Sequence, residues 1–159
     1  MKIKNVKNLD VSNGEGIGVS VFVSGCHFHC PGCFNEEAWD YNAGECFSDE
    51  KLEEILDLLA SPFVDHLSVL GGEPLSPENL EGVAHIIKAA RMRFTKPIWL
   101  WTGYEKNELT DKQKEVVKLC NFITYGRFVM EKRDISRRFS GSSNQQTETA
   151  DGKIIEKAE

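Results

Sequence analysis

The chain of 159 residues has no apolar run that approaches the roughly 18 residues a membrane-spanning helix needs. Its first ten residues, MKIKNVKNLD, lack the continuous apolar core of a signal peptide. The chain also lacks an excess of positive charge, because 19 Lys and Arg against 25 Asp and Glu give a formal net charge of -6. This balance disfavours nucleic acid or an anionic membrane as a partner. These absences predict a cytoplasmic protein, in which thiols stay reduced.

The sequence also lacks an internal repeat and a second domain, and its length predicts one compact unit. From residue 19 onward, short β-branched apolar runs alternate with amphipathic stretches, a pattern typical of an α/β fold with parallel strands and crossover helices. The expected strands are residues 19–24, 66–70, 97–101 and 120–125. The expected helices begin after the N-caps Ser48, Ser76 and Thr110 and end near residues 62, 93 and 119.

Distinctive loops follow all four expected strands. Right-handed crossovers would place the carboxyl ends of these strands at one edge of the sheet. The loops there begin with the cysteine-rich segment after the first strand and continue with residues 71–74, 102–104 and 126–127. Because open α/β sheets and barrels bind ligands at that edge, the loops predict a single site.

The last part of the chain is polar. Residues 140–152 contain no large apolar side chain, so this stretch is not expected to pack as a regular element. We therefore expect a folded domain over residues 1–139 and a polar C-terminal tail over residues 140–159.

Three of the five cysteines, Cys26, Cys30 and Cys33, fall within eight residues in a C-x3-C-x2-C spacing. Thiols so close together in a reducing compartment indicate a metal or cluster site. In a cubane cluster three cysteines satisfy three irons and leave the fourth open to another molecule. Two alternatives remain: zinc, with His27, His29 or Cys46 as an added ligand, or an electron-carrying cluster with Cys46 as its fourth cysteine.

The segment Gly71-Gly72-Glu73-Pro74 joins an expected strand to a capped helix. Paired glycines let a ligand approach the backbone closely, and Glu73 is suited to hold an ammonium group. These properties fit an amino acid ligand. The alternative is a structural turn, since Gly-Gly is common before a helix.

The three-cysteine loop together with Gly-Gly-Glu-Pro resembles the radical S-adenosylmethionine (SAM) enzymes. More specifically, the chain is similar to the activating enzymes of anaerobic (class III) ribonucleotide reductase. The matching segments are residues 13–16, 22–26, 30–35 with Trp39, 71–75, 98–104, 126–128 and 141–145. They cover nearly the whole chain in order.

The resemblance implies a partial, open (βα) barrel of the radical SAM type, with one [4Fe-4S] cluster on Cys26, Cys30 and Cys33. It implies reductive cleavage of SAM and formation of a glycyl radical on the large subunit of the reductase. The candidate SAM contacts are Gly32, Cys33, Phe34, Gly71, Gly72 and Glu73, with Thr102 added from its place after the third strand. A one-electron donor such as flavodoxin is an expected partner, and residues 141–145 are a candidate reductase contact.

Three positions depart from the family pattern: Gly18 and Ser140 stand where arginine is common, and Tyr125 where aspartate is usual. The lost charges would weaken contacts to SAM or to the partner. Two other functions stay open. One is a radical SAM enzyme that acts on a small molecule, as the 7-carboxy-7-deazaguanine synthases do, and the other is a non-catalytic zinc or iron–sulfur module.

Other side chains have structural interpretations. Cys120 begins an apolar strand and is expected to be buried. Trp99 and Trp101 alternate within a strand, so they should share a face and pack in the core. Arg133, Arg137 and Arg138 are expected in solvent, with partner docking as the alternative.

Overall fold

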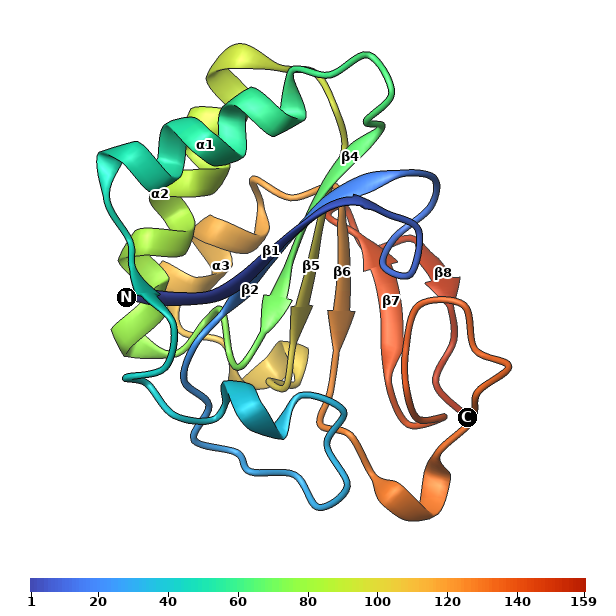
Figure 1. Cartoon of the computed structure of the whole chain (residues 1–159). Coiled ribbons are helices and arrows are strands. Elements are labelled where there is room, and N and C mark those ends of the chain that lie inside the picture. Colours follow the sequence, from blue (N-terminus) through green and yellow to red (C-terminus); the bar gives the residue numbers. More distant parts are fainter.

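Four parallel strands form the centre of one mixed sheet in a computed structural model that describes all 159 residues. The central strands, in spatial order, are β2 (Gly18–Val23), β4 (His66–Gly71), β5 (Ile98–Thr102) and β6 (Phe122–Tyr125). Antiparallel strands extend both sides, with β1 (Lys2–Asp10) and β3 (Glu45–Cys46) beside β2, and β7 (Gln146–Thr149) and β8 (Ile154–Glu156) beside β6. The eight-stranded sheet does not close, as Figure 1 shows.

Three helices cover one face of this sheet (Figure 1). They are α1 (Asp49–Leu59), α2 (Pro77–Arg93) and α3 (Asp111–Val117), and 3-10 turns occupy Glu36–Ala38, Lys106–Glu108 and Met130–Lys132. The predicted βα alternation is confirmed. Ser48 and Thr110 cap their helices by accepting hydrogen bonds from the backbone of Lys51 and Gln113. None of the helices combines the length and the apolar character that a membrane crossing demands.

Alternation along the central strands gives the sheet two different faces. Val21, Val69 and Ile123 point toward the helices and belong to the main apolar core. The helix-free face carries large aromatic side chains, and the predicted shared face of Trp99 and Trp101 is confirmed, since their rings stack 6.1 Å apart. The predicted burial of Cys120 is also confirmed.

The prediction that residues 140–152 do not pack as a regular element is wrong. β7 pairs with β6 over four residues, and Thr147 is fully buried. The polar composition misled the sequence analysis because the polar groups find partners here. Thr147 and Thr124 share a 2.7 Å hydrogen bond, and Glu148 forms an ion pair with Lys106 at 3.3 Å. β1 and β3, which the sequence analysis did not predict, complete the opposite side of the sheet.

Candidate cluster site at the carboxyl edge of the sheet

The loops that the sequence analysis assigned to one site do meet at one edge of the sheet. The central strands all end at the lower edge in Figure 1, where the cysteine-rich segment also lies. Backbone hydrogen bonds join these loops. Glu73 N donates to Gly25 O at 2.7 Å, and Gly126 N donates to Thr102 O at 3.1 Å.

The three clustered cysteines are half-buried, and each sulfur faces backbone N–H groups. Asn35 N donates to Cys33 Sγ at 3.4 Å, the amides of Phe28 and His29 face Cys26, and the amide of Phe128 faces Cys30. Burial raises the pKa of the Cys26 and Cys30 thiols, while these amides act in the opposite direction. Three thiols with amide donors form a set suited to thiolate ligation of an iron–sulfur cluster. No three His, Cys, Asp or Glu side chains converge on one point that would hold a single metal ion.

Aromatic contacts hold the cysteine loop in place. His29 adopts a left-handed backbone conformation, with φ of 48°, and its ring stacks on Trp39 at 4.4 Å. Phe28 packs edge-on against Tyr104 at 5.0 Å, and the Arg127 guanidinium lies 4.4 Å from the Phe28 ring centre. The loop is therefore fixed from both sides.

Gly71 and Gly72 are explained by close contact between two backbone segments. A Cβ on Gly71, whose φ is 119°, would lie 2.6 Å from backbone atoms of Val23. A Cβ on Gly72 would lie 2.3 Å from Gly25 O, at the base of the cysteine loop. The two glycines thus allow the end of β4 to pack directly under the cysteines.

The buried carboxylate of Glu73 accepts hydrogen bonds from this chain's own donors at both oxygens. Oε1 accepts from Leu75 N at 2.9 Å and from Thr102 Oγ1 at 2.7 Å, and Oε2 accepts from Gly103 N at 2.7 Å. Burial outweighs these donors and raises the pKa of Glu73 to about 7. Sequence reasoning placed Glu73 and Thr102 beside a ligand, whereas the structure pairs them with each other.

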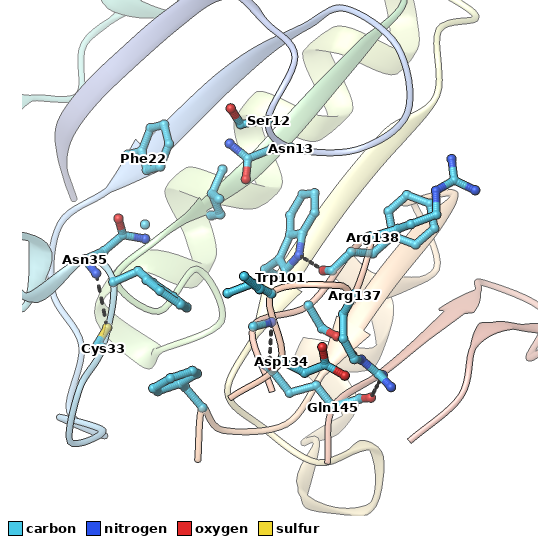
Figure 2. A pocket seen from close by; sticks show the side chains of 18 residues that line it. Ser12, Asn13, Phe22, Cys33, Asn35, Trp101, Asp134, Arg137, Arg138 and Gln145 are labelled. Carbon is cyan, nitrogen blue, oxygen red and sulfur yellow. Dashed lines mark hydrogen bonds between the residues drawn. The ribbon is translucent and has the colours of Figure 1, made fainter. Parts of the chain in front are cut away.

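A cavity of about 490 Å³ opens beside the cluster site on the helix-free face (Figure 2). Cys33, Phe34 and Gly71 line it from the edge, and Trp101 lines it from β5. Residues 134–141 line the opposite side, and Ser12, Asn13 and Phe22 complete the wall. The place of residues 134–139 beside the cysteines was not predicted, because no motif links that segment to them. The prediction that Arg137 lies in solvent is wrong, because its side chain is 6% exposed and it belongs to this wall. Arg133 and Arg138 are exposed as predicted, although Arg138 also lines the cavity.

The three departures from the family pattern each have a local structural account. A side chain on Gly18 would meet the His66 imidazole, which lies 2.1 Å from the Cβ position. Tyr125 points into the helix-side core, and burial raises its pKa to about 12. Ser140 Oγ donates to Glu156 Oε1 at 2.7 Å, so its neighbourhood is already occupied.

Comparison with known proteins agrees with this site. The family described as "4Fe-4S single cluster domain" matches residues 12–148. The anaerobic ribonucleoside-triphosphate reductase-activating protein of Escherichia coli K12 is 37% identical over 140 residues, which cover 86% of this chain and 91% of that protein. Proteins of the same description from Haemophilus influenzae and Enterobacteria phage T4 are 35% and 33% identical, over 86% and 91% of this chain and 90% and 92% of their own lengths. The chain belongs to the family of anaerobic ribonucleoside-triphosphate reductase-activating proteins, and its 4Fe-4S domain supports an iron–sulfur cluster.

Proposed function

We propose that this chain is a radical SAM enzyme that generates a glycyl radical on an anaerobic ribonucleotide reductase. The observation that carries the proposal is the shared position of two motifs. Cys33 and Gly71 line the same cavity, although they are 38 positions apart in the sequence. That arrangement would place SAM between the cysteines and the helix-free face. The open sheet would then be a partial barrel of the radical SAM type.

The residues of the edge have distinct roles in this proposal. Cys26, Cys30 and Cys33 would hold one [4Fe-4S] cluster, and the candidate SAM contacts are Gly32, Cys33, Phe34, Gly71, Gly72, Glu73 and Thr102. When bound, the cluster supplies the electron that cleaves SAM into methionine and a 5'-deoxyadenosyl radical, which removes a hydrogen atom from a glycine.

Protein groups around the cavity contribute binding and orientation. Glu73 joins the ends of β4 and β5, so it fixes the backbone amides beside the ligand. The rings of Phe34 and Phe128 lie 5.0 Å apart and give the cavity an apolar contact surface for the ligand. Gly141 and Gln145 also line the cavity, which supports the assignment of residues 141–145 to contact with the reductase.

The partners follow from this chemistry. The protein substrate would be the large reductase subunit, because the relatives are described as activating proteins of that enzyme. A one-electron donor such as flavodoxin would reduce the cluster. The cavity lies on the helix-free face of the sheet, and we expect the protein substrate to approach from this side.

The test uses the anaerobically reconstituted chain with SAM, a reductant and the cognate reductase. We expect about four irons per chain, formation of 5'-deoxyadenosine, and a glycyl radical signal on the reductase by electron paramagnetic resonance. Cys33→Ala should lose iron and both activities. Cys46→Ala is the matched control, because Cys46 is exposed on β3, and it should behave as the native chain does.

Each alternative gives a different result. SAM cleavage without a glycyl radical would contradict the substrate assignment and favour a small-molecule substrate. Loss of the cluster in Cys46→Ala would indicate a four-cysteine electron carrier. Zinc without iron in the purified chain would indicate a structural metal module.

A further inference from the structure

Residues 133–141, here called the strap, cross the helix-free face of the sheet without belonging to it. Only an isolated bridge between Arg133 and Ser142 ties the strap to a neighbouring segment by strand-like pairing. Two side chains of the sheet instead donate hydrogen bonds to the strap at Phe139. Trp101 Nε1 donates to Phe139 O at 2.7 Å, a bond drawn in Figure 2, and Thr124 Oγ1 donates to the same oxygen at 3.3 Å.

The carboxylate of Glu156, in β8, contacts four consecutive residues of the strap. It accepts hydrogen bonds from Arg138 N at 2.8 Å, Phe139 N at 3.3 Å and Ser140 Oγ at 2.7 Å. Arg137 Nε lies 3.5 Å from Glu156 Oε1, and the two side chains are only 6% and 14% exposed. A nearly buried ion pair with these added donors fixes geometry more strongly than an exposed pair does.

Arg137 extends the same network to the rest of the C-terminal region. Its guanidinium donates to Ser140 Oγ at 2.9 Å, Gln145 O at 2.6 Å and Lys157 O at 2.9 Å. Each of the three guanidinium nitrogens therefore donates either to the strap or to a residue that directly precedes β7 or follows β8. The position of the strap depends on β8, which lies outside the residues 12–148 matched by the family.

The strap is also a wall of the cavity. Five consecutive residues of it, from Arg137 to Gly141, line the cavity opposite Cys33 and Phe34. Gly141 packs against Phe34, since a Cβ there would lie 2.7 Å from the Phe34 ring. A shift of the strap would therefore change the width of the cavity, whereas the cysteines and Glu73 are held by separate contacts.

We propose that Glu156 is a positioning residue for the protein substrate: it holds the strap at the distance from the cluster edge at which the target glycine is presented. This inference rests on the proposed function. In Glu156→Gln the amide oxygen can still accept from the backbone N–H groups of Arg138 and Phe139, but an NH2 group replaces the oxygen that faces Arg137 Nε and Ser140 Oγ. The nearly buried Arg137 charge loses its carboxylate partner, so the strap would have to move. The strap reaches the cluster edge at Phe34, but the hydrogen bonds of Cys33 and Glu73 do not involve it. SAM cleavage should therefore be separable from radical transfer.

The experiment compares Glu156→Gln with the native reconstituted chain. Three quantities are measured: iron content, 5'-deoxyadenosine formed without reductase, and glycyl radicals formed per 5'-deoxyadenosine with reductase. We expect the first two to stay near native values. The third, the coupling ratio, should fall by about tenfold or more, because reaction rates drop steeply when reacting groups are misplaced by an ångström.

Glu148→Gln is the matched control. Glu148 lies on the adjacent strand β7, and its side chain is 8% exposed. Like Glu156 it forms an ion pair, but its partner is Lys106, which lies outside the strap. This variant should keep the native coupling ratio. If Glu156→Gln does not fold, Glu156→Asp retains the charge on a side chain one methylene shorter, and it should lower the ratio by a smaller factor.

The outcomes separate the inference from the proposed function. An unchanged coupling ratio in the folded Glu156 variant would overturn the inference, as would equal losses of iron, SAM cleavage and coupling, which would indicate a merely structural role. A native chain that forms no 5'-deoxyadenosine would instead contradict the proposed function itself.

Discussion

Glu73 connects two parts of the chain that are distant in sequence, and its pKa depends on burial. Its oxygens accept hydrogen bonds from Leu75 N, in the turn before α2, and from Thr102 and Gly103 at the end of β5. A carboxylate with three donors usually has a lowered pKa, but complete burial opposes this and raises the pKa to about 7. The residue is therefore poised to change charge near neutral pH.

This raised pKa predicts a pH dependence of stability. Between the ordinary value of 4.5 and about 7, the folded state binds a proton that the unfolded state has released. The stabilisation of the folded state by protonated Glu73 is therefore fully present below about pH 4.5 and is lost as the pH rises through about 7. Between pH 4.5 and 8 the free energy of unfolding of the native chain should fall by about 3 kcal/mol more than that of Glu73→Gln.

The measurement is urea unfolding of both proteins, prepared without cluster, across this pH range. Glu53→Gln is a suitable control, because Glu53 is exposed and its pKa is lowered by the hydrogen bond with Arg93. That variant should keep the native pH slope. Equal slopes for the native chain and Glu73→Gln would show that Glu73 does not bind a proton in this range.

At the residue scale, spacing predicted which side chains gather but not what they touch. The cysteine motif and Gly-Gly-Glu-Pro were placed correctly at one edge, because strand order determines that edge. The hydrogen bond between Glu73 and Thr102 was not predictable, since it depends on the separation of β4 and β5 after folding. The same holds for Gly18, whose missing side chain is explained only by the His66 ring.

At the scale of elements, the two predicted serine caps differ. Ser48 Oγ accepts from Lys51 N at 3.2 Å at the start of α1, whereas Ser76 makes no such bond at the start of α2. Ser48→Ala should therefore lower the free energy of unfolding by about 1 kcal/mol. Ser76→Ala should lower it by less, because proline at the first helical position already favours that start.

Chemical denaturation of the cluster-free chain checks this difference. The two variants serve as controls for each other, since each removes one hydroxyl before a helix. A larger loss for Ser76→Ala would mean that its hydroxyl has a partner that the structure does not show.

Element prediction succeeded where periodicity was strong. The central strands and the helices between them were found because apolar side chains recur with periods of 2 and 3.6. β1 was missed because its middle residues are mostly polar and exposed, as expected beside a short edge strand. β7 was missed because its buried residues are Thr147 and Glu148, which pair with polar partners that only the folded sheet supplies.

At the scale of the whole molecule, the C-terminal region completes the sheet and the cavity together. β7 covers the edge of β6, and β8 carries the carboxylate that holds the strap.

Deleting residues 146–159 should therefore expose the edge of β6 and remove the support of the cavity wall. The melting temperature should fall by on the order of 10 °C, since each kcal/mol is worth roughly 2–4 °C in a domain of this size. The control deletes only residues 158–159, which removes one hydrogen bond to the backbone of Ser143 and one to the side chain of Gln146, and it should lower the melting temperature by much less. Light scattering during heating would add a second measurement, because an uncovered β6 should promote association. A truncated chain that melts and scatters light as the native chain does would show that residues 146–159 are an independent tail.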